Sequence, residues 1–320
     1  MWRSILRFDP IPLLLTTADE ALFYNVQKDL LAETGVDQNK IWKSKPVQNI
    51  IKRQSTEGCW EYRGKQPGGE LGENYRLIET WKMVRLLVGK YAFHRDHQPI
   101  QRAAEYIFSC QTEEGDTRGI LSNQYMPYYN GVILELLIQA GYQQDERVLR
   151  ALDWLLGMRQ HDGGWIIPMN MFPLSQYYRL AAGEPLPPDR ALPSSHMATG
   201  MVLRAFCRHP LYNKRMEVLR AADLLASRLF LKDTFTSRQA AAYWFKLQYP
   251  FWWTTLLSAL DTLARFGFDH NDERIEKGLE WFIENQNRDG TWHASYDRTD
   301  PSADAWITFA VCRMFKYFLP

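Results

Sequence analysis

The sequence predicts an all-α protein with a single α/α toroid, a barrel of five to six helical hairpins. Three observations lead to this fold class. A helical unit recurs along the chain. In each copy an amphipathic helix, which suits an outer layer, is followed after a glycine turn by a helix apolar on all sides, which suits an inner layer. The alternation of polar and apolar residues that is typical of strands is nearly absent.

The composition fits a folded chain that binds something apolar. Of 320 residues, 46% are hydrophobic and 23% are charged, which excludes disordered and fibrous classes. The 38 basic and 37 acidic residues nearly cancel, so the overall charge does not favour nucleic acid as a partner. The aromatic content of 14% is high, and so much ring surface must fill a large core or line an apolar cavity.

Cysteine usage and the amino terminus indicate a cytoplasmic protein. The four cysteines lie far apart without a Cys-x-x-Cys pair, as expected of reduced core thiols. The first apolar stretch covers only residues 11–15, next to Pro10 and Pro12, and no later segment has the length of a membrane span. We therefore expect neither a signal peptide nor a transmembrane helix.

Two segments fix the register of the repeat. Residues 145–156 (DERVLRALDWLL) and 272–283 (DERIEKGLEWFI) agree in residue or type at nearly every position. Each is followed by a glycine and a tryptophan at the same offsets, namely Gly163 and Trp165 in one copy and Gly290 and Trp292 in the other. The same register identifies copies that start at residues 40 and 97 and a degenerate copy at residue 215.

The repeat divides the chain into two parts. Residues 40–320 form the predicted toroid, with a proline-rich insertion at 183–193 that cannot be helical. Residues 1–39 are expected to form an N-terminal segment with a helix over 19–33, which either closes the ring or plugs it. The predicted inner helices cover residues 77–88, 132–138, 197–206, 252–263 and 306–318, and Pro250 is expected to start the fourth of them.

The turns of the repeat resemble a known motif. Gln54, Gly58 and Trp60, and again Gln286, Gly290 and Trp292, are similar to the Gln-Trp repeats of squalene and oxidosqualene cyclases and related prenyltransferase subunits. The resemblance covers roughly residues 40–320 and implies the terpenoid cyclase-like toroid. The motif itself is structural, since the glycine permits a left-handed turn at a helix end and the tryptophan packs on the next unit. Function belongs to the site rather than to the barrel.

Candidate site residues cluster where the inner helices begin. Because these helices run in one direction, their starts converge on one end of the ring. The proposed substrate-binding residues there are Tyr75, Tyr125, Tyr128, Tyr129, Asn130, His196, Tyr249, Phe251, Trp252, Trp253 and Trp306. A cavity rimmed by such rings suits an apolar, isoprenoid-like ligand, and ring faces can stabilise carbocations.

The resemblance also implies a carboxylic acid that protonates an alkene. The Asp-x-Asp-Asp and Asp-Cys-Thr-Ala-Glu motifs of the family do not occur, and Asp304 stands closest to the position of the second. Glu73 is the second candidate acid. Burial of Asp304 among Trp252, Trp306 and Tyr128 would favour the acid role, whereas an exposed carboxylate would favour a binding protein or scaffold. The Asp-x-Cys zinc ligands of prenyltransferases are also missing, so neither metal nor cofactor is expected.

Three functions remain open on these grounds. The first is a cyclase-like or prenyltransferase-like barrel that binds an isoprenoid, with acid-initiated cyclisation, an isomerase reaction, if it is an enzyme. The second is a non-catalytic binding or subunit barrel. The third is a carbohydrate-active toroid, in which a lyase would use Asn130, His196, Tyr128 or Tyr249, and Arg76, and a hydrolase would use Glu73 and Asp304.

Overall fold

The fold is known from a computed structural model that describes residues 2–64, 74–172, 176–181, 183–234, 238–296 and 300–320. Within these residues the chain forms helices and turns, with three isolated β-bridges and no strand. The predicted all-α class is confirmed.

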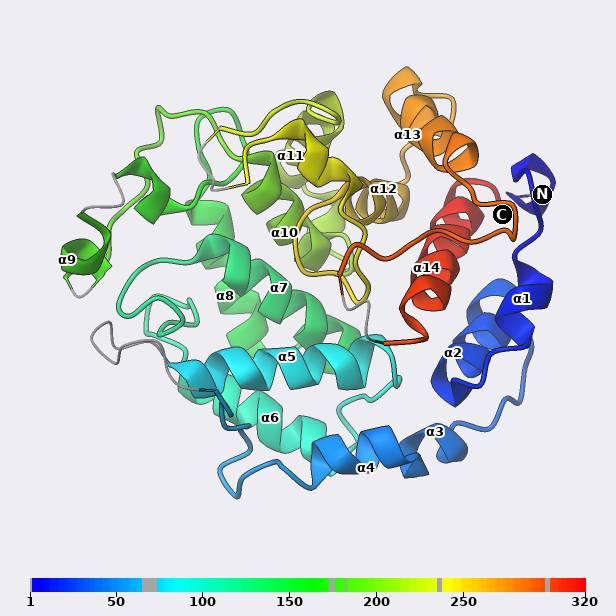
Figure 1. Ribbon diagram of the computed structural model, residues 1–320. Coiled ribbons are helices and arrows are strands. Elements are labelled where there is room, and N and C mark those ends of the chain that lie inside the picture. Colours follow the sequence, from blue (N-terminus) through cyan, green and yellow to red (C-terminus); the bar gives the residue numbers. More distant parts are fainter. Residues whose placement is uncertain (1, 65–73, 173–175, 182, 235–237, 297–299) are drawn as a thin grey trace.

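Five long helices form the inner layer, and each packs against the next (Figure 1). In the last four of them nearly every side chain is buried, which explains their largely apolar sequences, whereas the first keeps partly exposed polar residues such as Glu79 and Lys82. In ring order they are α5 (Tyr75–Gly89), α7 (Pro127–Leu137), α10 (His196–Phe206), α12 (Leu256–Arg265) and α14 (Ala303–Phe318).

Amphipathic helices cover this layer from outside. Each outer helix precedes its inner helix along the chain, and aspartates cap two of them: Asp145 accepts a hydrogen bond from the Arg147 N–H, and Asp272 from the Arg274 N–H. The outer helices are α4 (Lys45–Ile51), α6 (Gln98–Ser109), α8 (Glu146–Gly157), α11 (Met216–Ser227) and α13 (Glu273–Glu284). The first of them follows a separate short helix, α3 (Asn39–Lys43), and the break between the two lies at Ser44, two residues before Pro46.

The N-terminal segment lies between α14 and the end of α5. It contains α1 (Ile11–Leu15) and α2 (Glu20–Asn25), which continues as a wider turn over Val26–Leu30, and all three pack on α14. The side-chain amide of Asn25 donates to the carbonyl of Lys90, directly after α5. The segment therefore stands in the gap between the first and last inner helices (Figure 1).

In three units, the motif tryptophan joins the outer helix to the inner helix through the same two contacts. The indole N–H of each tryptophan donates to a carbonyl ten residues earlier, on the preceding outer helix, at 2.7–2.8 Å (Trp60 to Ile50, Trp165 to Leu155, Trp292 to Phe282). The backbone N–H of each donates to a threonine on the following inner helix, namely Thr80, Thr199 and Thr308.

The motif glutamine reaches the next unit. Gln54 donates to the carbonyl of Pro99 and Gln111 to that of Arg147, both at 2.8 Å. The side-chain amide of Gln160 instead donates to the carbonyls of Asp189 and Leu192. The proline-rich insertion therefore takes the position of a following outer helix. Gln286 donates to the carbonyl of Phe8, which ties the last motif to the start of the chain.

The start of the fourth inner helix differs from the prediction. Helix α12 begins at Leu256, where the Thr255 and Ser258 side chains form a reciprocal cap, and Pro250 lies in irregular backbone before it. The expectation that Pro250 starts this helix is therefore wrong. The reason is that the chain before Thr255 does not continue the helix but runs among α5, α10 and α14.

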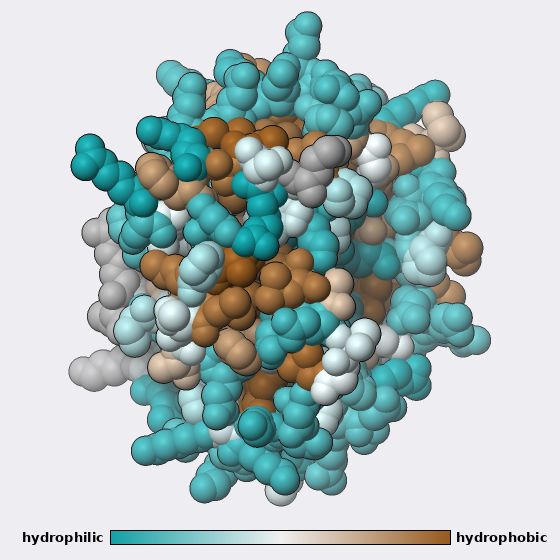
Figure 2. All heavy atoms as spheres, turned by 90° about the vertical axis from the view of Figure 1, so that its right-hand side faces the viewer, coloured by the Kyte–Doolittle hydropathy of each residue, from teal (hydrophilic) through white to brown (hydrophobic). Residues whose placement is uncertain are grey.

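The short remaining helices lie in the connections between these units. They are Trp2–Ile5, Ile138–Tyr142, Pro168–Met171, Tyr177–Ala181 (α9), Tyr212–Lys214 and Ala241–Phe245. Figure 2 shows the face that carries the N-terminal segment, where hydrophobic residues gather near the centre between hydrophilic ones.

Candidate functional site

Residues 248–253, which we call the lumen segment, lie inside the ring. Arginines from three inner helices hold it: Arg85 donates to the Pro250 carbonyl at 2.9 Å, Arg204 to the Trp252 carbonyl at 3.0 Å, and Arg313 to the Tyr249 hydroxyl at 3.3 Å. Buried carbonyl groups need such donors where the backbone has no ladder or helix to satisfy them. The interior of the ring is therefore occupied by the chain itself.

Each inner helix contributes one buried Arg, Glu or Asp side chain to this region. In ring order these are Arg85, Glu135, Arg204, Asp261 and Arg313, each less than 10% exposed, so the sign of the charge alternates. Arg204 pairs with Glu135 at 3.0 Å, and Arg313 pairs with Asp261 at 3.4 Å. Buried charges in such pairs have their desolvation offset by a partner.

Two further arginines strengthen these pairs. Arg208 contacts Glu135 at 3.2 Å, and Arg265 contacts Asp261 at 2.9 Å. Burial by itself raises the pKa of Asp261, but the charges of Arg265, Arg313 and Arg208 outweigh it and lower this pKa to about 2. Asp261 is therefore ionised at neutral pH.

Most of the predicted aromatic residues lie in two groups of contacting rings, which the lumen segment joins along the chain. Tyr128 packs on Tyr129 at 4.7 Å between centroids, and Trp81, which the sequence analysis did not single out, contacts both Tyr129 and Trp252. In the lumen segment, Trp252 stacks on Trp253 at 5.5 Å, and Tyr249 contacts both Phe251 and Trp306. Burial raises the pKa of the Tyr249 hydroxyl, although Arg313 opposes this effect.

A cavity of about 390 Å³ borders the lumen segment. Tyr249, Pro250 and Trp252 form one wall. The other walls combine apolar side chains of α5 and α14 with cations, and include Met83, Leu86, Ala303 and Ile307 together with Lys82, Arg85 and Lys90. This volume lies within the range of small-molecule sites.

Asp300 lines this cavity and two neighbouring ones. It pairs with Lys90 at 3.4 Å, and both residues also line a cavity of about 1010 Å³ beside the N-terminal segment. A third cavity of about 440 Å³ contains Asp300 and Asp304. Burial tends to raise the pKa of Asp300, but hydrogen bonds from Ser302 and the charge of Lys90 lower it overall.

The environment expected for a catalytic Asp304 is not found. Its side chain is 46% exposed, contacts the His293 ring at 2.7 Å and accepts a hydrogen bond from the backbone of Ala294. The expectation that Asp304 is buried among Trp252, Trp306 and Tyr128 is therefore wrong. The first turn of α14 faces solvent at this position. Among the described residues, every shift of a carboxyl pKa is downward. An acid that stays neutral at pH 7 needs a raised pKa. Glu73 lies outside the described residues.

Other predicted residues serve the fold or lie elsewhere. Asn130 is 1% exposed and bonds the backbone N–H and carbonyl of Thr117, so it replaces the threonine contact of the other units. Tyr125 donates to Glu114 at the surface, and Tyr75 contacts Tyr62. These three positions do not line the cavity beside the lumen segment, and the expectation that one cavity gathers all the candidate rings is wrong.

Two more expected ligand contacts are corrected. The Trp306 ring is fully buried, and its indole N–H donates to Asp19 of the N-terminal segment at 2.8 Å. Arg76, named for the lyase alternative, forms exposed ion pairs with Glu57 and Glu61. No contact among the described residues joins Arg76 to Asn130 or to His196.

His196 belongs to a separate polar cluster at the start of α10. Asp233 lies 3.7 Å from its ring and accepts hydrogen bonds from the N–H groups of His196 and Met197 and from the Ser195 hydroxyl. Burial lowers the pKa of His196 to about 4, against the charge of Asp233. The ring stacks on Trp244 at 4.4 Å.

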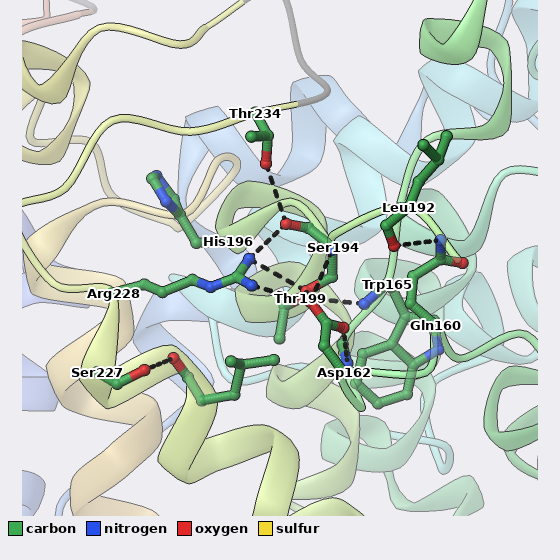
Figure 3. Close-up of polar contacts among 12 residues, drawn as sticks. Gln160, Asp162, Trp165, Leu192, Ser194, His196, Thr199, Ser227, Arg228 and Thr234 are labelled. Atoms are coloured by element: carbon green, nitrogen blue, oxygen red, sulfur yellow. Dashed lines mark hydrogen bonds and ion pairs between the residues drawn. The ribbon is translucent and has the colours of Figure 1, made fainter. Parts of the chain in front are cut away.

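A second carboxylate, that of Asp162, lies near the start of α10. Asp162 accepts from the backbone and hydroxyl of Ser194 and pairs with Arg228 at 2.9 Å, while His196 points away from this network (Figure 3). Thr199 accepts from the Trp165 backbone beside it. The cluster thus anchors α10 to the preceding motif. The described residues contain no group of three or more His, Cys, Asp or Glu side chains able to hold a metal ion.

The buried charges are the feature that the sequence analysis missed. Two of them stand alone in their helices: Glu135 is the only charged residue in 127–137, and Arg204 is the only one in 197–206. A single charge within a helix that is buried on all sides requires a partner inside the protein. That pattern was visible in the sequence, whereas the position of the lumen segment was not.

The comparison with known families agrees with this architecture. The family model of the squalene-hopene cyclase C-terminal domain matches residues 132–306, more than half of the chain. The chain belongs to this family, and its terpenoid cyclase-like α/α toroid is the fold expected of it. No curated protein matches the chain.

Solved structures with a similar course of the chain are distant. The apo type II terpene cyclase MstE from Scytonema shares 14% identity with a TM-score of 0.33, over 87% of this chain and 96% of that one. An arginine-to-alanine variant of MstE in complex with geranylgeranyl dihydroxybenzoate shares 11% with a TM-score of 0.37, over 88% and 98%. A protein from Actinoplanes shares 13% with a TM-score of 0.32, over 89% and 100%. Among the described residues, no helix is both long and apolar enough to cross a membrane.

Proposed function

We propose that this protein binds an isoprenoid or another apolar chain in the cavity beside the lumen segment. The observation that carries the proposal is the wall of this cavity, where the rings of Tyr249 and Trp252 face apolar side chains of α5 and α14. Large rings and aliphatic side chains favour an apolar ligand because its binding removes apolar surface from water.

The proposal is confined to binding. Acid-initiated cyclisation needs a carboxylic acid that stays neutral at the working pH. Asp304 is half exposed and paired with His293, and Asp300 has a lowered pKa. Neither group supports an acid at the cavity.

Mass spectrometry of organic extracts from the purified protein tests the proposal. We expect an apolar compound to co-purify with the wild type and to be lost from Leu86→Trp, because Leu86 lines the cavity and the larger indole fills it. Leu156→Trp is the matched control, since Leu156 is also partly buried but lies on outer helix α8.

Recovery of the same compound from Leu86→Trp would place the ligand elsewhere. If the wild type yields nothing, titration with geranylgeraniol by calorimetry decides, and absence of binding there would contradict the proposal. A response that is lost in Leu86→Trp and kept in Leu156→Trp would support it.

A further inference from the structure

The four arginines that share Glu135 and Asp261 exceed their counter-ions. Arg204 and Arg208 contact Glu135, while Arg265 and Arg313 contact Asp261, so four guanidinium groups meet two carboxylates. Arg204 is 2% and Arg313 is 8% exposed. Arg208 and Arg265 keep 15% and 19% of their side chains exposed, so the surplus positive charge lies at the edge of the buried pairs. Positive charge that is not fully compensated near a protein interior favours a further anionic partner.

Besides these carboxylates, the two arginines bind neutral oxygen atoms. Arg204 donates to the Trp252 carbonyl and Arg313 to the Tyr249 hydroxyl, both in the lumen segment. Hydrogen bonds to a charged acceptor are roughly twice as strong as those between neutral groups. The lumen segment therefore supplies oxygen atoms to both arginines but no charge.

Several buried donors in the same place have no acceptor. They are Arg204 Nη1, Arg313 Nε and the indole N–H groups of Trp81 and Trp252. Buried donors in folded proteins are nearly always hydrogen-bonded, so a set of four around one segment indicates a missing acceptor. The cavity of about 390 Å³ opens along this segment at Tyr249, Pro250 and Trp252.

We propose that Arg204 and Arg313 form a site for an oxyanion, the carboxylate or phosphate group at one end of the apolar ligand, and that the lumen segment occupies this site in the unliganded protein. The proposal rests on the proposed function and adds to it the chemical class of the ligand head. In the bound state the anionic oxygens replace the Trp252 carbonyl and the Tyr249 hydroxyl as acceptors, and the apolar chain lies along Met83, Leu86 and Ile307. The segment belongs to no helix, so its displacement breaks no helical hydrogen bonds.

Calorimetric titration with matched ligands tests the oxyanion site. Farnesol, farnesoic acid and farnesyl phosphate share one apolar chain and differ in the head group, and inorganic phosphate serves as the head group alone. We expect at least one of the two acids to bind about tenfold more tightly than farnesol, as expected for a charge-assisted hydrogen bond. Which acid binds more tightly distinguishes a carboxylate from a phosphate source.

Variants show whether the arginines cause this preference. Arg313→Gln is expected to bring the acid and the alcohol close to equal affinity, whereas Arg220→Gln, at an exposed position of α11, keeps the preference. Circular dichroism checks the fold of both. If Arg313→Gln does not fold, hydrogen exchange in the wild type decides: the acid should speed exchange in residues 248–253 and leave α13 unchanged.

The outcomes separate this inference from the proposed function. Equal affinity for farnesol and both acids in the wild type would overturn the oxyanion site but leave the apolar site standing. A preference for the acid that persists in folded Arg313→Gln, or exchange in residues 248–253 that does not respond to the acid, would also overturn it. Binding of none of the ligands would contradict both proposals.

Discussion

At the scale of single residues, the glycines of the repeat turns differ in what surrounds them. Gly58 has a φ of +91°, and a Cβ built on it would lie 2.2 Å from the carbonyl oxygen of Arg102 on the next outer helix. Gly163 has a φ of +97°, but a Cβ there would meet nothing within 4 Å. Both positions therefore have a left-handed backbone that disfavours a Cβ, but only at Gly58 would a Cβ also clash with the neighbouring helix.

Alanine substitutions separate these two effects. Gly163→Ala should lower the free energy of unfolding by about 1–2 kcal/mol, because a left-handed backbone disfavours a Cβ. Gly58→Ala should cost roughly 1–3 kcal/mol more, because the Cβ pushes α6 away as well. Urea denaturation measures both, and equal losses would contradict the proposed close approach of the two units.

His196 makes stability depend on pH. Burial holds its pKa at about 4 in the folded protein, against an ordinary value of 6.5, with the charge of Asp233 opposing and that of Arg228 adding to the effect. Between these values the unfolded chain binds a proton that the folded protein does not, so stability falls as the pH drops from about 6.5 towards 4. The loss amounts to about 3 kcal/mol at pH 4 for this group.

Replacement of the ring isolates this contribution. In His196→Phe, which retains an aromatic ring against Trp244, unfolding free energy should fall less between pH 6.5 and 4.5 than in the wild type. His161→Phe, at an exposed position, should follow the wild-type curve. Parallel curves for the wild type and His196→Phe would show that this histidine titrates normally.

At the scale of elements, helix α10 has a cap from a distant part of the chain in addition to its local cap, Ser195. Asp233 accepts the N–H groups of His196 and Met197 in the first turn of this helix, and a carboxylate there also favours the helix dipole. Most helix caps are local, as Asp272 is for α13. The sequence pattern identifies local caps but not this one.

Separate alanine substitutions of Asp233 and Asp272 compare the two kinds of cap. Asp233→Ala should lower the unfolding free energy by roughly 2–3 kcal/mol, because it leaves several buried donors without a partner. Asp272→Ala should cost about 1 kcal/mol, as for an ordinary cap at the surface. Thermal denaturation of both variants tests this order, and an equal or reversed order would contradict it.

The elements could be predicted from the sequence to different degrees. Periodicity identified the inner helices 197–206 and 306–318 to within three residues at each end, because both are long and bounded by clear signals. It failed at residues 252–255, where apolar rings continue the helical pattern although the chain enters the ring. Local composition cannot distinguish a ring buried in a helix from one buried in irregular backbone.

The candidate site was less predictable than the fold. Tyr249 and Trp252 were identified because large rings cluster before an inner helix, and both line the cavity. Asn130 was wrongly predicted to bind a ligand, because in the sequence a structural amide that replaces a motif threonine cannot be distinguished from a polar site residue. The contacts of Arg204 and Arg313 depend on which helices are neighbours, and sequence spacing within one helix does not contain that information.

At the scale of the whole molecule, closure of the ring joins the two ends of the chain. Gln286 accepts from the Phe8 N–H and donates to the carbonyls of Phe8 and Gly290, and it is 6% exposed. In the first two units the glutamine, Gln54 or Gln111, binds the next outer helix, so the N-terminal segment takes that position for the last unit.

Loss of this contact should loosen the N-terminal segment. We expect Gln286→Ala to lower the unfolding free energy by roughly 1–3 kcal/mol and to speed hydrogen exchange in residues 2–15. Gln101→Ala, at an exposed position of α6, should change neither. Unchanged exchange in residues 2–15 of Gln286→Ala would show that other contacts close the ring.

The most direct test of the proposed function is to locate the ligand on the chain. A diazirine-bearing geranylgeraniol, photolysed with the purified protein and followed by peptide mass spectrometry, labels what lies beside the bound chain. We expect label in residues 82–90, 248–253, 294–296 and 300–307, the segments that contribute to the cavity wall, and competition by unlabelled geranylgeraniol. Label confined to the outer helices, or label in these segments that excess geranylgeraniol does not displace, would contradict an apolar site beside the lumen segment.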